Sequence, residues 1–234
     1  MPFLMFLQND IAAVADSTAV NLATTTSQSI SPLDLLMKGG MIMIPIAILF
    51  IAALYLFFER YLYIKRTSRL DNNFLFTIRE MLYNGNVPGA LAFAKASNFP
   101  IARLLEKGIN RLGSPIRDIE NAIENTAKVE IYNMEKNLGL LSAIAAIAPM
   151  FGFLGTVTGM IRSFHDISLA NDINIGIISS GIYEKMITSA TGLIVGIIAH
   201  VFYTILMAMI DRNVNKMEVT AIDFMDILYK PVGK

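Results

Sequence analysis

The stretch LGLLSAIAAIAPMFGFLGTVTGMI, residues 138–161, decides the fold, because it runs for twenty-four residues without a charged side chain. An α-helix rises 1.5 Å per residue, and about 20 apolar residues cross the hydrocarbon core of a bilayer. Residues 138–161 are therefore long enough to span a membrane as one helix. Pro149 lies within the stretch, and membrane helices tolerate proline better than soluble helices do.

Two further segments have the length and apolar character of a membrane span. Residues 41–58 carry no charge, and residues 175–210 are mostly apolar and longer than a bilayer requires, so that part of this segment should project into water. Over the whole chain, 54% of the residues are hydrophobic and only 16% are charged. The sequence predicts an all-α membrane protein with transmembrane helices at 38–64, 138–162 and 175–210, of which the second and third extend into the cytoplasm.

The distribution of charge predicts the orientation. Basic residues follow the first span (Lys65 and Arg66) and the third (Arg212 and Lys216), whereas residues 1–40 are net acidic. Basic residues near span ends favour the cytoplasmic side. We therefore expect an outer, periplasmic arm at 1–37, a cytoplasmic insert at 65–137, a short periplasmic loop at 163–174 and a cytoplasmic C-terminal helix or tail at 211–234. The first residues are apolar but lack a basic region, which disfavours a cleaved signal peptide.

The insert is predicted to be helical. Turn-forming residues at 84–86, Pro100 and the sequence at 112–115 divide it into short helices. A longer helix should follow at 116–137, where apolar residues recur every three or four positions and form a stripe. No glycine or proline separates this stripe from the second span, which predicts one continuous helix. The stripe needs an apolar partner, and the C-terminal segment is the expected one.

Several classes of function are disfavoured by composition. The chain has no cysteine, and its two histidines, His165 and His200, lie too far apart for a metal motif. The net charge is zero, so no nucleic-acid partner is implied. No phosphate-binding glycine loop and no nucleophile–base pair are evident in the spans. We expect no enzyme activity, no metal and no cofactor.

The second span carries small or hydroxylated residues along one face, and two interpretations of this face are open. Pro149, Gly152, Thr156 and Gly159 follow one another at spacings of three and four, and Gly155 and Gly159 form a small-xxx-small pair. In lipid such residues allow two helix backbones to approach closely. Packing is therefore the favoured interpretation. The alternative is that Thr156 faces a water-lined path.

The third span contains a carboxylate, Glu184. A charged side chain at the bilayer centre costs at least ~2.5–3.5 kcal/mol, so an intramembrane acid is a candidate functional residue. Helical spacing places Thr188 and Thr191 on its face. The alternative is that Glu184 and Lys185 only mark a helix end at the outer interface. His200 is interpreted as a packing residue in preference to a proton-handling group.

Two motifs carry a family resemblance. IAPMFGFLGTVTGMIRSF at 147–164 and GIYEKMITSATGL at 181–193 resemble the second- and third-span signatures of the MotA/TolQ/ExbB proton-channel family, and Glu59-Arg60 resembles its junction after the first span. Three spans resemble the ExbB and TolQ members, since MotA has four. The resemblance covers about residues 35–215.

The resemblance implies a subunit of an ion-driven motor. Family members form a ring, typically a pentamer, whose pore holds the single-span helices of an ExbD-like or TolR-like partner bearing the proton-carrying Asp. By motif position, the pore hydroxyl of span two corresponds to Thr156, the acid of span three to Glu184 and the pore threonine of span three to Ser189. Here that threonine is a serine, and a proline common further along the span is Ile198. Whether Ser189 or the pair Thr188 and Thr191 faces the pore stays open.

Three functions follow from these expectations. The first is an ExbB-like subunit in the inner membrane that energises transport across the outer membrane through a TonB-like protein. The second is a TolQ-like subunit that maintains the envelope during division. The third, from another class, is a membrane scaffold with no conductance. The sequence does not distinguish H⁺ from Na⁺ as the ion.

Overall fold

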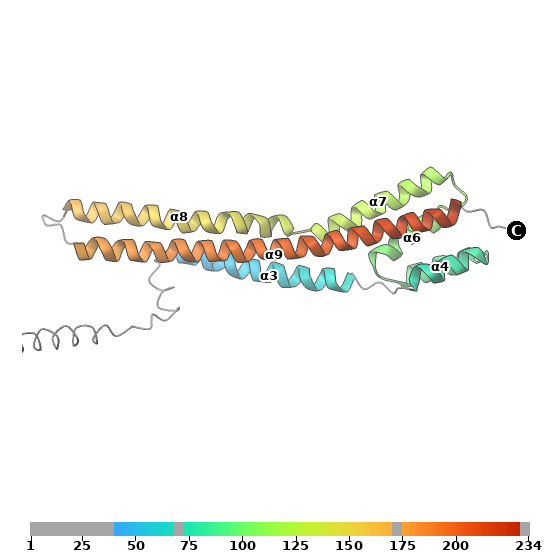
Figure 1. Cartoon of the computed structure of the whole chain (residues 1–234), viewed down its shortest axis with the longest axis horizontal. Coiled ribbons are helices and arrows are strands. Elements are labelled where there is room, and N and C mark those ends of the chain that lie inside the picture. The colour runs from blue at the N-terminus through green and yellow to red at the C-terminus, as the bar shows by residue number, and fades with distance from the viewer. Residues whose placement is uncertain (1–39, 68–72, 170–174, 230–234) are drawn as a thin grey trace, which may run out of the picture. The chain divides into compact units, whose positions relative to one another are not determined.

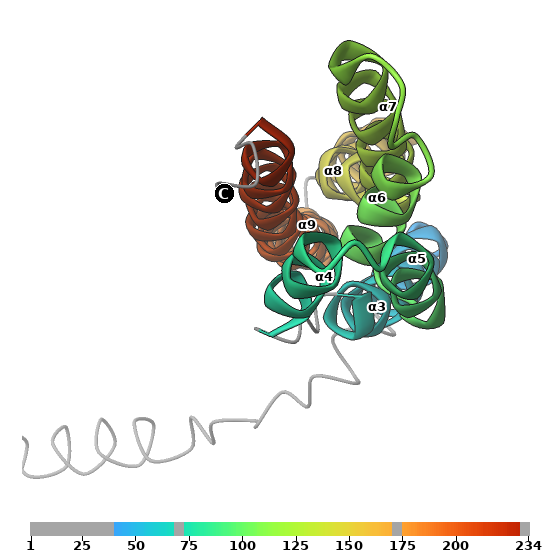
Figure 2. The same cartoon turned by 90° about the vertical axis from the view of Figure 1, so that its right-hand side faces the viewer.

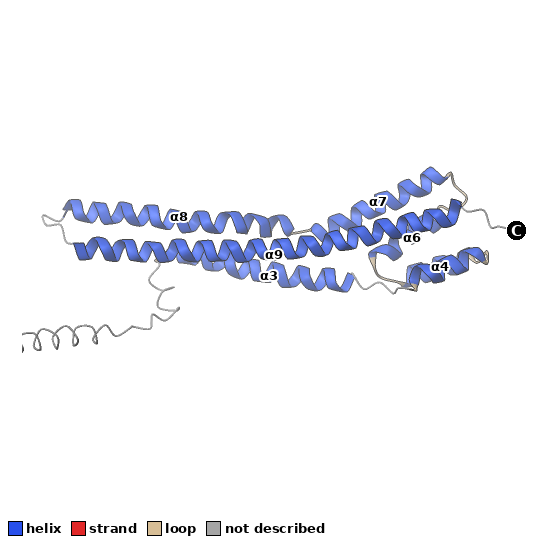
Figure 3. Cartoon of the chain, viewed as in Figure 1, coloured by secondary structure: helices blue, strands red, loops and turns tan. Residues whose placement is uncertain are grey.

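The computed structural model describes residues 40–67, 73–169 and 175–229, and every element in these ranges is an α-helix (Figure 3). The predicted N-terminal arm and the question of its cleavage lie outside the described residues. Within 175–184, the side chains of five residues, Glu184 among them, are also not described. The helices are α3 (Met43–Thr67), α4 (Phe74–Tyr83), α5 (Val87–Ala96), α6 (Pro100–Ile109), α7 (Ile116–Glu135), α8 (Leu138–Leu169) and α9 (Ile175–Tyr229).

The long helices α8 and α9 pack against each other in opposite directions over most of the length of α8, and α3 packs against both (Figure 1). Three helical segments of the described chain are long and apolar enough to cross a membrane. This confirms the predicted three-span, all-α architecture. Only 28% of the most apolar window of each segment is buried within the chain, so most of these apolar side chains face outward, as lipid-facing or subunit-facing surfaces do.

Helices α8 and α9 are longer than a bilayer requires. Helix α9 has 55 residues, which corresponds to about 80 Å, and continues through Ile198 and past the charged Asp211 to Tyr229. The third span thus continues as one helix beyond its apolar part, and its projection into water stays a prediction. The C-terminal end of α8 lies at Leu169. Residues 163–169 are therefore helical, whereas the sequence predicts a connecting loop there.

The prediction of one continuous helix through the insert into the second span is wrong. Helix α7 ends at Glu135 and α8 begins at Leu138, with Asn137 in the left-handed conformation at a φ of 68°. Asparagine adopts this conformation more readily than most residues and ends helices in place of glycine. Arg60, near the end of α3, donates a hydrogen bond of 3.3 Å from Nη1 to the carbonyl of Asn133. This bond satisfies one of the carbonyls that the end of α7 leaves without an intrahelical partner.

The insert helices lie on one side of the C-terminal part of α9 (Figure 2), and α4, α6 and α7 contact it. Their buried apolar side chains form one cluster with those of α9. Asn84–Asn86, Pro100 and the 112–115 segment separate them as predicted. At Gly108 in α6, a Cβ would lie 2.8 Å from the ring of Phe224 in α9 and 2.9 Å from Ile123 in α7. Three helices thus converge closely here, and a side chain at position 108 would require Phe224 and Ile123 to move. The α7 stripe is therefore covered by α6 as well as by α9, whereas the sequence suggests the C-terminal segment alone.

A bidentate ion pair fixes α6 to α7. Both nitrogens of the Arg103 fork, Nε and Nη2, lie 2.7 Å from the carboxylate oxygens of Glu130, whose side chain is only 7% exposed. Hydrogen bonding to Glu130 raises the pKa of the Arg103 guanidinium, against the lowering effect of burial. The arginine therefore stays charged beside a carboxylate that is almost wholly removed from water.

Candidate proton-pathway site

The candidate site lies along the seam between α8 and α9, and glycines bring the two backbones together there. A Cβ on Gly192 would lie 2.7 Å from the carbonyl oxygen of Ala148 and 2.8 Å from the Cα of Gly152. A Cβ on Gly152 would in turn lie 3.0 Å from the carbonyl oxygen of Ser189. Because the neighbouring atoms belong to the backbone, neither position has room for a side chain. The small residues of span two therefore pack against α9, as the favoured interpretation predicts.

Thr188 lies inside this seam. Its side chain is fully buried, and a Cβ on Gly155 would meet its methyl group at 2.7 Å and Ile42 at 3.6 Å. Thr188 therefore points to the side of the seam that α3 covers. In a single chain it packs between helices and does not reach an open surface. Thr191, one turn further, is partly exposed, and its hydroxyl donates a 2.9 Å hydrogen bond to the carbonyl of Ile187.

Thr156 and Ser189 lie toward the opposite edge of the seam, away from α3. Thr156 is one turn beyond Gly152 in α8, and the backbone of Ser189 in α9 lies against Gly152. Both residues are partly exposed. On the same edge, Pro149 of α8 meets Gly196 of α9, where a Cβ would lie 2.5 Å from the proline ring. Two hydroxyl-bearing residues from different helices thus lie within about one turn of each other along an edge that α3 leaves open.

The backbone of Glu184 lies in α9, and the contacts of its neighbour Lys185 show its depth. The aliphatic stem of Lys185 packs against Gly159 of α8, and Nζ of Lys185 lies 3.9 Å from where a Cβ on Gly40 would be. Gly40 is three residues before the start of α3. Position 184 is therefore level with the beginning of the first span, at one end of its apolar stretch. Such a depth fits an acid at the mouth of a pore and equally the helix-end alternative.

The hydroxyls of the seam have chemistry suited to relaying protons. The hydroxyl of Thr156 donates a 3.1 Å bond to the carbonyl of Gly152, which leaves its oxygen able to accept a hydrogen bond. A hydroxyl that rotates can accept a proton from one neighbour and donate to the next. Such groups can line a polar path without holding a permanent charge, which hydrocarbon surroundings would penalise.

His200 lies on the open side of α9. It is exposed and lies eleven residues after Ser189, which is three helical turns and therefore the same face. The side chain of His200 is therefore not buried within the single chain, and its role as a packing residue stays a prediction. Its exposed face is otherwise apolar, with Ile197 and Val201 beside it in sequence, and both are also exposed.

Comparison with known proteins identifies the family of this chain. The profile of the MotA/TolQ/ExbB proton channel family matches residues 96–219, more than half of the chain, from α5 to the C-terminal part of α9. The chain belongs to the MotA/TolQ/ExbB proton channel family. Both candidate motifs and the α8–α9 seam fall within the matched region.

Several relatives carry ExbB or TolQ names. The chain is 28% identical to biopolymer transport protein ExbB-like 1 of Synechocystis, over 86% of this chain and 80% of that protein. It is 29% identical to a biopolymer transport protein ExbB homolog of Methanothermobacter thermautotrophicus, over 80% of this chain and 66% of that protein, slightly less than two thirds. A Tol-Pal system protein TolQ of Haemophilus influenzae is 32% identical over 32% of each chain. The similarity to these two ExbB-like relatives thus extends over more of the chain than the similarity to this TolQ protein does.

Other parts of the site carried weaker signals in the sequence. The contact of Lys185 with Gly159 and that of Ser163 with Gly181 join the C-terminal part of α8 to the N-terminal part of α9. The packing of a lysine of one helix on a glycine of another helix leaves no periodic pattern in the sequence. The Glu59-Arg60 pair is recognisable as a motif, but its link to the end of α7 depends on how the helices pack.

Proposed function

We propose that this member of the MotA/TolQ/ExbB family is an ExbB-like ring subunit of an inner-membrane motor driven by the proton-motive force. In this proposal several copies, five by the family pattern, surround the membrane helices of an ExbD-like partner. Proton passage along the ring drives movement that a TonB-like protein transmits to the outer membrane. The N-terminus is periplasmic and the C-terminus cytoplasmic. The membrane potential supplies ~2.3 kcal/mol per charge per 100 mV.

The observation that carries the proposal is the pairing of Thr156 with Ser189 on the edge of the α8–α9 seam that α3 does not cover. A pore at the centre of a ring must be lined by surfaces that the subunit's own first span leaves open. Thr156 and Ser189 meet this condition, whereas Thr188 is buried on the α3 side. We therefore assign Thr156 and Ser189 to the proton path and Thr188 to helix packing. Thr191 is a secondary candidate.

Glu184 is proposed as the acid of the pore mouth. Its backbone lies level with the start of α3, so an incoming proton would meet it before the hydroxyls deeper in the seam. The proton carrier within the pore is then an Asp of the partner, and Glu184 concentrates protons at the entrance. On this assignment, Glu184→Gln should slow transport without preventing assembly.

The hydroxyl assignment is tested by complementing a deletion strain with variant chains and measuring receptor-dependent uptake across the outer membrane. Thr156→Val and Ser189→Ala should each lower uptake about tenfold or more, because an apolar side chain cannot relay a proton. Thr156→Ser should keep most of the uptake. Thr158→Val is the matched control, since Thr158 lies on the same helix about half a turn from Thr156 and its hydroxyl bonds to Leu154 and Gly155 within α8.

Native mass spectrometry of each detergent-purified complex shows whether a variant still assembles. Normal assembly with unchanged uptake in both Thr156→Val and Ser189→Ala would contradict the proton path and favour a scaffold.

The TolQ-like role is the second candidate, because TolQ proteins are among the relatives. The phenotype of the deletion strain distinguishes the two roles. An ExbB-like subunit is required for receptor-dependent uptake, whereas loss of a TolQ-like subunit should make the envelope leak periplasmic proteins and leave uptake intact.

A further inference from the structure

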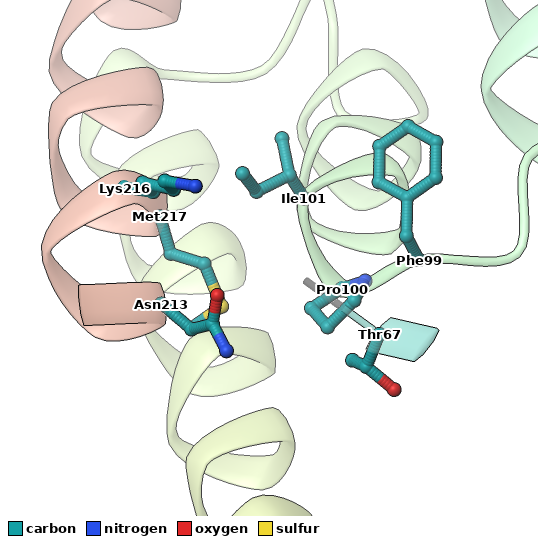
Figure 4. A pocket seen from close by; sticks show the side chains of 7 residues that line it. All are labelled: Thr67, Phe99, Pro100, Ile101, Asn213, Lys216 and Met217. Carbon is teal, nitrogen blue, oxygen red and sulfur yellow. The ribbon is translucent and has the colours of Figure 1, made fainter. Parts of the chain in front are cut away.

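A small cavity lies where α3 and α9 leave the apolar region and the insert begins. It is lined by Thr67 at the end of α3, by Phe99, Pro100 and Ile101 at the start of α6, and by Asn213, Lys216 and Met217 of α9 (Figure 4). The cavity is open on one side and holds about 10 Å³, room for one small polar atom. It is unrelated to the α8–α9 edge that carries Thr156 and Ser189.

Asn213 is the unusual residue in this cavity. Its side chain is buried, since only 7% of the residue is exposed. Within the described residues, its Nδ2 atom has no hydrogen-bond partner. Leaving a buried polar group unpaired costs ~1–3 kcal/mol, so such groups normally have a partner. Figure 4 shows the amide nitrogen directed from α9 toward Pro100 and Thr67. The nitrogen needs an acceptor that enters from the open side.

Further donors lie at this cavity, beside the hydroxyl of Thr67, which can both donate and accept. Helix α6 begins at Pro100, and the side chain of its N-cap residue, Phe99, cannot accept a hydrogen bond from the first turn. The N–H groups of Ile101 and Ala102 therefore lie at the positive end of the helix dipole without intrahelical partners. Lys216 is exposed, and Figure 4 shows its ammonium group extending toward Ile101. The described residues that line the cavity include no carboxylate.

We infer that this cavity binds a phosphate group, with one phosphate oxygen accepting from Asn213 Nδ2 and the rest of the group lying outside against Lys216 and the α6 N-terminus. Helix N-termini bind phosphate in this way. The position at the end of the apolar segments, with Lys65 and Arg66 in the last turn of α3, suits the headgroup of an anionic phospholipid. Free phosphate shares the chemistry and is the other source. Binding would join α3, α6 and α9 at the base of the membrane region.

The test is native mass spectrometry of the full chain in detergent, titrated separately with phosphatidylglycerol, with diacylglycerol, which lacks phosphate, and with inorganic phosphate. We expect phosphatidylglycerol to bind more tightly than diacylglycerol, and Asn213→Leu and Lys216→Gln each to weaken that binding about tenfold. Inorganic phosphate that binds with the same dependence on Asn213 and Lys216 would identify free anion as a source.

Matched controls separate the cavity from the general basic character of this region. Asn215→Leu and Arg212→Gln alter exposed residues of the same helix that do not line the cavity, and both should bind phosphatidylglycerol as the unaltered chain does. Lys216 is exposed, so Lys216→Gln should fold even if Asn213→Leu does not. Equal binding of phosphatidylglycerol and diacylglycerol, no binding of any probe, or equal losses in the controls would overturn the inference.

Discussion

At the scale of single residues, one asparagine changes the course of the chain. Asn137 has a positive φ, and this one residue separates a long amphipathic helix in the insert from the helix of the second span. Leu138 then begins α8, and the N–H of Leu141 bonds to the carbonyl of Asn137 at 3.4 Å. The residue thus ends one helix and begins the next within a two-residue turn.

The stability of variants at position 137 should depend on how readily the new residue adopts the left-handed conformation. Asn137→Gly should be close to neutral, because glycine adopts this conformation without steric cost, whereas Asn137→Ala should destabilise the chain by about 1 kcal/mol. The measurement is the midpoint of thermal unfolding in detergent, followed by circular dichroism at a fixed heating rate. Asn125→Ala, at an exposed position within α7, is the control and should leave the midpoint unchanged or raise it. A fall for both Asn137→Gly and Asn137→Ala would show that the side chain, not the conformation, is what matters there.

At the scale of elements, the contact between α8 and α9 is made mostly by backbone. Gly152 and Gly192 face each other so closely that side chains are excluded, and Thr188 fills the space beside Gly155. Hydrocarbon solvates leucine as well as a protein core does, so helices in lipid gain most from close van der Waals packing. The glycines therefore stabilise this pair and also set which hydroxyls remain on its open edge.

Gly192→Ala should separate the two helices. The added methyl would lie 2.7 Å from a carbonyl oxygen and 2.8 Å from a Cα of α8, neither of which can move aside, so we expect a loss of about 1–3 kcal/mol of stability. Gly139→Ala is the matched control in α8, because a Cβ there projects into open space among the described residues. Resistance to unfolding by SDS in mixed micelles compares the two variants. Equal resistance of the two variants would show that α8 and α9 can move apart at Gly192 without loss of stability.

At the scale of the whole described chain, the insert is tied together by apolar packing and by one well-formed ion pair. Phe224 of α9 is fully buried among the insert helices, and Phe74 of α4 stacks on Phe93 at 5.2 Å between ring centroids. The Arg103–Glu130 pair joins α6 to α7 on another side of this cluster. The insert helices therefore share one apolar core with the C-terminal part of α9.

Arg103→Ala should destabilise the insert by about 2–3 kcal/mol, since it leaves the carboxylate of Glu130 buried without its partner. Lys128→Ala removes an ion pair with Glu124 whose side chains are 67% and 57% exposed, and it should cost no more than about 0.5 kcal/mol. Proteolysis of the insert under native conditions measures the difference, since cleavage follows local unfolding. Equal cleavage rates for the two variants would show that the buried pair adds no stability.

The three spans, the helical insert with its internal breaks and the family motifs could all be predicted from the sequence. The length of an uncharged segment and the presence of turn-forming residues are local properties of the sequence. They therefore predict membrane spans and helix breaks without knowledge of the packed structure. The break at Asn137 could not be predicted, because its asparagine is a weak signal and Arg60, which hydrogen-bonds to the end of α7, lies 73 residues from Asn133 in the sequence.

The sequence by itself determined which residues are candidates for a proton path, and only the tertiary structure showed which of them are buried and which are partly exposed. Helical spacing grouped Glu184 with Thr188 and Thr191, whereas motif position favoured Ser189. The packing of α3 against one side of the α8–α9 seam buries Thr188 and leaves Thr156 and Ser189 on the open edge. Periodicity identifies residues that share a face of one helix. Which face another helix covers is a property of the packed molecule.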